Sequence, residues 1–215
     1  MKKLLLAFIL LGSVAVEAQQ KFTFVFLHKR TDKAELPKEE VDKIMEGHMA
    51  NINRLASEGK LVAAGPFEGG GGLFIFNSTS QAEVKDWLQT DPGVRAERWN
   101  VEVLPYEPRI GGVCTVGEPY EMVSYTFVHF KPQVMKFNVQ NADETLRKQF
   151  EFVKKLAATG NVVTEATFGG LDGGIWVMRG DVAQETILGA PAVVESLFEP
   201  EWKKLWIAKG AFCEK

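Results

Sequence analysis

The feature that most constrains the fold of this chain is an internal repeat. Phe127 and His129 follow Phe26 and His28 at a spacing of 101 residues, within similar aromatic and β-branched segments. The same order of features continues along the chain, where residues 55–62, 71–75 and 91–94 resemble residues 156–163, 173–177 and 190–193. A fixed order of features at a nearly constant spacing is typical of a duplicated unit. We therefore expect two copies of one unit of about 95 residues.

Hydrophobic patterning predicts the same element order, β-α-β-β-α-β, in both copies. In the first copy, Pro37 and the acidic residues after it open a helix, and Gly59 ends it. The predicted strands are residues 22–27, 61–64, 73–76 and 100–104 in the first copy and 122–130, 162–167, 175–178 and 205–212 in the second. The predicted helices are residues 37–58 and 81–88, then 142–158 and 182–188. This is the α+β ferredoxin-like arrangement, present twice in tandem.

The N-terminal residues 1–18 have the pattern of a cleaved signal peptide. Two lysines precede eight apolar residues, and Val16 and Ala18 supply the small residues of a cleavage site. Eight apolar residues are far fewer than the roughly 20 that a membrane helix needs. We therefore expect a periplasmic or secreted protein with no membrane span in its mature form. Its predicted parts are a first domain of residues 19–106, a linker of residues 107–119 and a second domain of residues 120–215.

The charge balance argues against a nucleic-acid-binding protein. The chain has 25 Lys and Arg against 28 Asp and Glu, a formal net charge of -3, and no basic stretch that could neutralise phosphates. Hydrophobic residues make up 46% of the 215 residues, which is too many for a disordered chain. The three His and two Cys show no metal-ligand spacing, so we expect no metal site and no cofactor.

The only two cysteines, Cys114 and Cys213, favour a structural disulfide if the chain is exported, because thiols pair in oxidising compartments. The alternative is two reduced, buried cysteines. A catalytic cysteine is the least favoured interpretation, since no neighbouring residue marks either thiol as activated.

Two further patterns suggest chemistry but have simpler interpretations. The four glycines of residues 69–72 look like a phosphate-binding loop, but they lie between two predicted strands, whereas such a loop precedes a helix. A β-hairpin is therefore the favoured interpretation. Phe24, Phe26, Phe127 and Trp176 alternate along predicted strands, which is typical of a core-facing sheet surface rather than of a ligand cavity.

His48 and Asp91 are the strongest candidates for chemistry. His48 interrupts the apolar stripe of the first predicted helix, which is formed by Val41, Ile44, Met45, Ile52 and Leu55. A single histidine in such a stripe is more often a hydrogen-bonded core residue than a catalyst. Asp91 precedes a Pro-Gly pair, where an aspartate ordinarily serves in a turn or caps a helix.

The first copy resembles the YCII-related (YciI-like) domain family. The resemblance rests on four features in order: His48 on the first helix, the Leu-Ala-Ser-Glu-Gly pattern of residues 55–59, the Ala-Gly-Pro-Phe motif of residues 64–67, and the Thr-Asp-Pro-Gly-Val motif of residues 90–94. It implies a catalytic dyad of His48 and Asp91, with Gly65 and Pro66 in the wall of a substrate pocket. It also implies the dimeric α+β barrel fold, here as an intramolecular pseudo-dimer of the two copies.

The second copy lacks the dyad, since Gln149 and Ala190 stand where His48 and Asp91 stand in the first. Gln149 could line a surviving polar cavity, and His28 is a further pocket candidate. The resemblance implies an enzyme that needs no cofactor and moves a proton on a small organic substrate, as an isomerase or a dehydrochlorinase-like lyase does. The alternative is a non-catalytic envelope protein that binds a small ligand or a partner. An internal pseudo-dimer favours a monomer.

Overall fold

The computed structural model describes residues 22–133 and 139–213 and is a mixed α+β structure. The predicted signal peptide, residues 1–18, lies outside the described residues. The first half contains, in order, β1 (Phe22–Lys29), α1 (Lys38–Ser57), β2 (Leu61–Pro66), β3 (Gly72–Phe76), α2 (Gln81–Leu88), α3 (Pro92–Arg95) and β4 (Trp99–Ile110). The second half contains β5 (Met122–Pro132), the 3-10 turn η1 (Val139–Asn141), α4 (Ala142–Ala157), β6 (Val162–Thr167), β7 (Gly174–Arg179), α5 (Gln184–Leu188), α6 (Pro191–Val194) and β8 (Phe198–Ala208).

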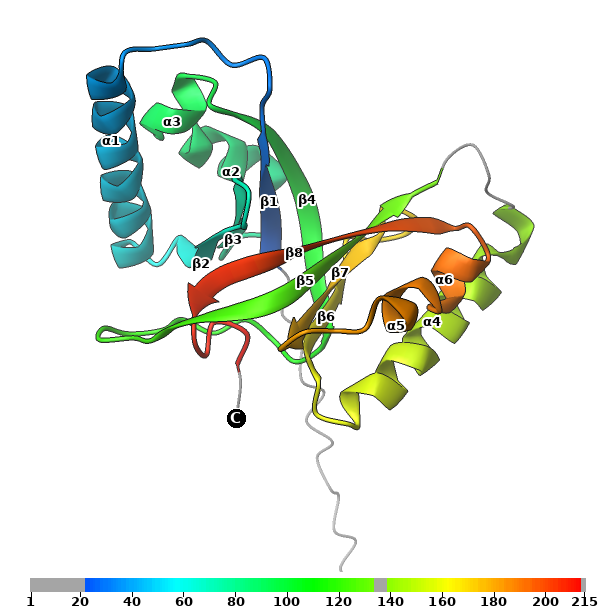
Figure 1. Cartoon of the computed structure of the whole chain (residues 1–215). Helices are drawn as coiled ribbons and strands as arrows, with labels where there is room; N and C mark the ends of the chain where they lie inside the picture. The colour runs from blue at the N-terminus through cyan, green and yellow to red at the C-terminus, as the bar shows by residue number, and fades with distance from the viewer. Residues whose placement is uncertain (1–21, 134–138, 214–215) are drawn as a thin grey trace, which may run out of the picture.

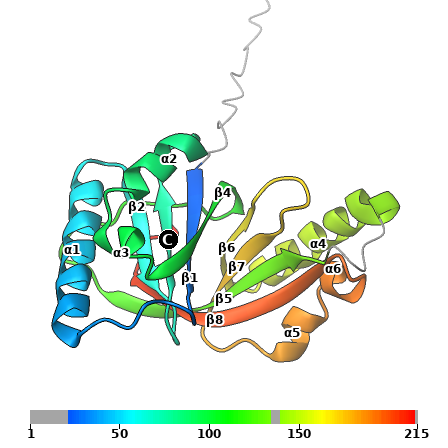
Figure 2. The same cartoon turned by 90° about the horizontal axis from the view of Figure 1, so that it is seen from above.

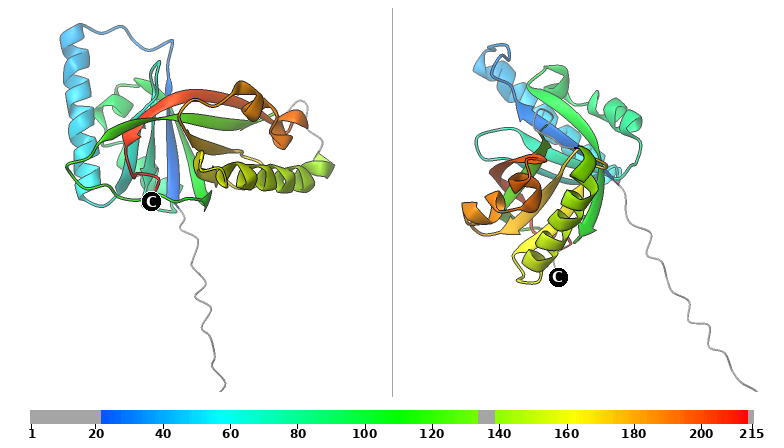
Figure 3. Two further views of the ribbon diagram at one scale, coloured as in Figure 1. Left: turned by 60° about the horizontal axis from the view of Figure 1, so that its bottom comes forward. Right: turned by 90° about the vertical axis from the view of Figure 1, so that its right-hand side faces the viewer.

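The strands form one antiparallel, eight-stranded sheet in the order β2-β3-β1-β4-β6-β7-β5-β8. Within each half the first strand is central and pairs with the third and fourth, so the two halves have the same internal order. The junction is made by the end of β4, where Glu107, Pro108 and Ile110 pair with β6. A main-chain bond from the Glu68 N–H to the Lys204 carbonyl, 2.9 Å long, joins the hairpin after β2 to β8. The two ends of the sheet therefore meet (Figure 3).

The molecule is built in layers, with helices on the outside and the inner sheet faces turned toward each other (Figures 1 and 2). Helices α1 to α3 cover the first half and α4 to α6 cover the second. The core between the sheets is shared, since Phe24 of β1 and Phe127 of β5 stack with ring centroids 6.3 Å apart. Trp176 instead lies beneath the second helix layer. The four aromatic residues predicted as core are all buried.

Local sequence signals explain the best-predicted elements. Ser80 caps α2 by accepting a hydrogen bond from the Glu83 N–H at 3.2 Å, and the helix spans the predicted residues. Residues 67–71 form the hairpin between β2 and β3, and Gly69, Gly70 and Gly71 all have positive φ. The hairpin interpretation of the four glycines is confirmed.

The predicted bounds of β4, β8 and α5 are wrong, and β1, β2 and β5 each end two residues beyond their predicted ends. Strand β4 continues to Ile110, beyond the predicted end at residue 104, because its last residues pair with the other half. Its extension takes residues 107–110 out of the predicted linker. Strand β8 spans Phe198–Ala208 rather than residues 205–212, because residues 198–201 pair with the end of β5 and a turn at Gly210 stops the strand. Helix α5 begins at Gln184, two residues later than predicted.

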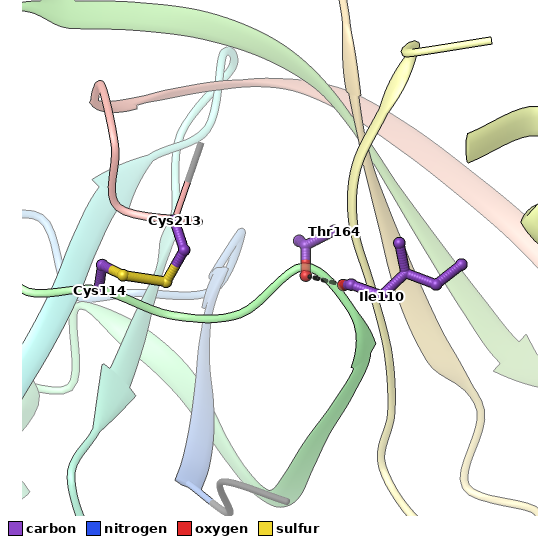
Figure 4. Close-up of a disulfide and its surroundings, with 4 residues drawn as sticks. All are labelled: Ile110, Cys114, Thr164 and Cys213. Atoms are coloured by element: carbon purple, nitrogen blue, oxygen red, sulfur yellow. Dashed lines mark hydrogen bonds between the residues drawn. A yellow bond between two sulfur atoms is a disulfide. The ribbon is translucent and has the colours of Figure 1, made fainter. Parts of the chain in front are cut away.

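Cys114 and Cys213 form a disulfide with their Cα atoms 5.1 Å apart, so this prediction is confirmed at the level of geometry (Figure 4). Cys114 follows β4 and Cys213 follows β8, and the Cys114 N–H also donates to the Ala211 carbonyl at 2.9 Å. Nearby, the Thr164 hydroxyl donates to the Ile110 carbonyl at 2.9 Å, which fixes the end of β4 against β6. The disulfide therefore ties the segment between the halves to the end of the last strand.

Candidate functional site

The predicted dyad residues, His48 and Asp91, are in direct contact. His48 Nδ1 lies 2.8 Å from Asp91 Oδ2, and the two residues are 6% and 0% exposed. His48 is on the inner face of α1, whereas Asp91 immediately precedes α3. The contact therefore joins α1 to the start of α3 through two residues that are 43 positions apart in sequence.

Asp91 is held by three further N–H groups. Its Oδ1 accepts hydrogen bonds from the main-chain N–H groups of Gly93 at 2.8 Å and Val94 at 3.2 Å, so it caps α3 as predicted. Its Oδ2 also accepts from Asn51 Nδ2 at 3.3 Å. Because the carboxylate accepts from Nδ1–H, the imidazole takes the tautomer in which Nε2 is the unprotonated nitrogen. Nε2 is therefore the nitrogen that can accept a proton.

A polar network extends from the dyad to the surface. The Thr90 hydroxyl and Arg54 Nη2 both donate to Asn51 Oδ1, at 2.9 and 2.8 Å. On the other side, the His48 ring packs against Trp99, with centroids 4.7 Å apart, and against Phe74. Sequence reasoning missed Asn51, although it lies three residues after His48, on the same helix face.

At the positions that match the dyad, the second half holds its helix against the same turn through an uncharged amide. Gln149 Oε1 on α4 accepts a hydrogen bond at 3.0 Å from the main-chain N–H of Ala192, in the first turn of α6. The two residues are again 43 positions apart, and Gln149 is buried. The amide of Gln149 thus performs the capping that Asp91 performs in the first half.

The remaining pocket candidates lie elsewhere in the molecule. Gly65 packs on β8, where an added Cβ would lie 2.6 Å from the Trp206 carbonyl oxygen. Pro66 is exposed at the end of β2. His28 lies at the end of β1 and bonds through Nε2 to Glu102 Oε2 at 2.7 Å. Among the residues that the structure describes, no hydrogen bond, ion pair or ring contact joins any of these three residues to His48 or Asp91.

His28 lines a hollow between the two halves, here called the inter-half hollow. Its other walls include Phe26 and Lys29 of β1, Phe67 of the hairpin, Phe127 and His129 of β5, and Glu201 and Lys203 of β8. The hollow measures about 330 Å³ with its solvent-open part, of which about 20 Å³ can hold the centres of water-sized atoms. His129 occupies the position in the second half that His28 occupies in the first.

The charged groups around this hollow shift one another's pKa values. Burial, helped by nearby Lys131, lowers the pKa of His129 to about 4. Burial would raise the pKa of Glu201, but the ammonium groups of Lys131 and Lys203 bring it down to about 2. The hydrogen bond from His28 holds the pKa of Glu102 below its usual range. His129 is therefore uncharged at neutral pH, whereas Glu201 is ionised.

Residues 22–107 match the family model of the YCII-related domain. The match extends from β1 into β4 and includes both His48 and Asp91. The second half lies outside the matched residues of the YCII-related domain. No curated protein matches the chain.

Two solved structures resemble the chain weakly. One is a candidate monooxygenase from Lactobacillus acidophilus NCFM, with 11% identity, a TM-score of 0.43, and coverage of 88% of this chain and 94% of that one. The other is a candidate monooxygenase from Fusobacterium nucleatum, with 9% identity, a TM-score of 0.45, and coverage of 90% and 94%. Similarities with TM-scores below 0.5 carry no assignment of activity to this chain.

Residues 22–133 and 139–213 contain neither a candidate membrane helix nor a candidate metal cluster. No helix there is long and apolar enough to cross a bilayer. Those residues also contain no group of three or more His, Cys, Asp or Glu side chains arranged to hold a metal ion.

Proposed function

We propose that this protein is an enzyme that uses the His48–Asp91 dyad as a general acid/base on a small organic substrate. The observation that carries the proposal is the 2.8 Å contact between His48 Nδ1 and Asp91 Oδ2 within the segment that matches the YCII-related domain. A histidine oriented by a carboxylate can take up and return a proton without help from a metal or cofactor.

The reaction class follows from what one such pair can do. His48 Nε2 accepts a proton from a carbon next to a carbonyl or a leaving group, and Asp91 balances the imidazolium that forms. In an isomerisation, the proton returns to another atom of the same substrate. In an elimination, the C–H electron pair becomes a double bond while the leaving group, for example chloride, departs with its own pair. The Gly93, Val94 and Asn51 N–H groups keep the Asp91 carboxylate in one orientation throughout.

The second candidate function is non-catalytic binding, and the Gln149–Ala192 contact favours it. In the second half a neutral amide makes the equivalent helix-to-turn contact at 3.0 Å. On this hypothesis the His48–Asp91 contact only holds α1 against α3, as the Gln149 contact holds α4 against α6. The protein then binds a small ligand or partner without changing it.

The double variant His48→Gln/Asp91→Ala separates the two hypotheses, because it gives the first half the residues of the second. The variant keeps a side-chain acceptor for the Gly93 N–H and removes both ionisable groups. The assay incubates wild type and variant in D2O with a panel of small keto acids and chlorinated rings. It follows deuterium uptake, isomer formation and chloride release by NMR and chloride titration.

The enzyme hypothesis predicts that turnover of a panel compound falls by about 100-fold or more in the double variant. Turnover that survives unchanged in the variant overturns the role of the dyad. Failure of the wild type to turn over any compound favours the binding hypothesis. A variant of Gln149, such as Gln149→Ala, is the matched control and leaves turnover unchanged.

We further propose that the two halves arose by duplication and form an intramolecular pseudo-dimer of the α+β barrel type. Their shared element order and the sheet junction at β4 and β6 support this proposal. A monomer at micromolar concentration in analytical ultracentrifugation is the expected result. A stable dimer would contradict it.

Export is the remaining part of the proposal, and it rests on residues 1–18 alone. Cleavage after Ala18 would leave Gln19 as the first residue of the mature chain. N-terminal sequencing of protein recovered from the periplasm or medium of an expressing bacterium tests this. Recovery of the intact chain with Met1 from the cytoplasm alone would contradict it.

A further inference from the structure

We propose that the inter-half hollow is a second site, which binds a small carboxylic acid with a flat, apolar body. This proposal is independent of the dyad, because the hollow is lined by β1, β5, β8 and the β2–β3 hairpin and not by α1 or α3. It requires both halves of the chain, because its two histidines come from different halves.

The first observation is an unpartnered polar group. His129 is 7% exposed and lines the hollow, and no hydrogen bond joins its ring to any residue that the structure describes. The fully buried side-chain atoms without a partner in the described residues are Tyr106 Oη and Gln133 Oε1, so the His129 nitrogens instead reach the solvent of the hollow, where water or a ligand can bind them. The low pKa of His129, about 4, means that the ring is neutral at pH 7 and offers one N–H donor and one acceptor.

The second observation is an aromatic wall that both halves build. The Phe26 ring stacks with both histidines, with its centroid 5.1 Å from that of His28 and 4.4 Å from that of His129. Phe67 and Phe127 continue the wall, with centroids 4.9 Å apart. A surface of this kind favours a flat, apolar ligand body.

The third observation is an excess of positive charge. Glu201 is shared by Lys131 and Lys203, and Glu102 is bonded to His28. Lys29 also lines the hollow and forms no ion pair with a described residue. The three ammonium groups therefore exceed the two carboxylates, so the ligand group that enters should be an anion.

The size of the hollow limits that anion to a small group. Space of about 20 Å³ for atom centres holds one or two water-sized atoms, since one water needs roughly 10–15 Å³ on this scale. The two oxygens of a carboxylate fit this limit. The flat body of the ligand would then lie against Phe26 and Phe67, in the solvent-open part.

Histidine NMR provides the test, because the chain has only three His. Benzoate is titrated into the mature chain while the ring C–H signals of His28, His48 and His129 are followed, assigned with single His→Gln variants. We expect saturable shifts of the His28 and His129 signals, with a dissociation constant on the order of 1 mM, and no shift of His48. Neutral benzamide should bind at least about fivefold more weakly, because it lacks the charge.

Two variants test the assignment of residues. Lys29→Ala should weaken benzoate binding about fivefold, whereas Lys85→Ala, the same change on exposed helix α2, should not. His129→Phe should abolish binding without lowering Tm, because it removes the ring nitrogens that face the hollow and keeps an aromatic ring of similar size. A residue with a merely structural role would instead lower Tm.

Three results would overturn the proposal: no saturable shift, equal shifts at all three histidines, or unchanged affinity in both Lys29→Ala and His129→Phe. The proposed acid/base function fails separately, since it depends on turnover in the His48→Gln/Asp91→Ala variant. That variant should bind benzoate as the wild type does.

Discussion

The two halves of the chain hold the same helix against the same turn with different chemistry. In the first half, His48 reaches a carboxylate that caps α3, whereas in the second half Gln149 caps α6 directly. The two strand-end histidines differ as well, since His28 is bonded to Glu102 and His129 has no described hydrogen-bond partner. The shared positions are therefore requirements of the fold, and the differences mark where one half can do what the other cannot.

The largest expected effect concerns what keeps the halves together. The variant Cys114→Ser/Cys213→Ser removes a disulfide that spans 99 residues and should lower the free energy of unfolding by about 4–5 kcal/mol. Urea unfolding with and without reductant measures this. A loss below about 1 kcal/mol would mean that the shared core alone holds the halves in register.

Asp91→Ala removes the contact between α1 and the start of α3 in the first half. It should lower the free energy of unfolding by about 3–4 kcal/mol, because the His48 ring and three N–H groups lose their buried acceptor. Urea unfolding measures this loss. Adding His48→Gln should recover part of it, since the glutamine amide can accept from the Gly93 N–H as Gln149 does from Ala192. A double variant less stable than Asp91→Ala alone would show that a Gln149-type contact cannot replace the His48–Asp91 contact.

The contrast between the two histidines predicts a pH effect. The pKa of His129 is about 4 in the folded protein and near 6.5 when unfolded, so the unfolded chain binds the proton first as pH falls. Neutral His129 therefore contributes to the free energy of unfolding in full above about pH 6.5. This contribution, about 3 kcal/mol in total, is lost as the pH drops toward 4. Urea unfolding between pH 7 and 4 measures it, and His129→Phe is the control. An equal pH slope in that variant would contradict the prediction.

Gln149→Ala should have the smallest effect, about 1–2 kcal/mol, because one neutral hydrogen bond to the Ala192 N–H is lost. The comparison with Asp91→Ala is the informative measurement. If Gln149→Ala lowers the free energy of unfolding as much as Asp91→Ala does, the His48–Asp91 contact stabilises the fold no more than the Gln149–Ala192 contact.

Much of the architecture was predictable because it depends on local signals. Alternating apolar residues located the strands of each half, and Asp91 was predicted from its position alone to serve in a turn or to cap a helix. The contact between His48 and Asp91 was expected only from the family resemblance, since nothing local joins residues 43 positions apart.

The remaining features depend on contacts between the halves, which no local pattern records. The extension of β4 to Ile110 exists because β6 lies beside it, and residues 198–201 of β8 carry Pro and Glu that argue against a strand until β5 pairs with them. The burial of His129 is set partly by Phe26, a residue of the other half. The alignment of His129 with His28 predicted where His129 lies on its strand, but it did not predict that the two histidines have different surroundings.

The disulfide has a further consequence for the covalent connectivity of the chain. Residues 114–213 form a closed ring that contains the whole second half. A single protease cut between Cys114 and the start of β5 therefore leaves one covalent molecule under non-reducing conditions. A cut between Ile110 and Cys114 instead releases the ring as a separate species. The position of a nick within a few residues thus decides whether the two halves are joined by bonds or only by their shared core.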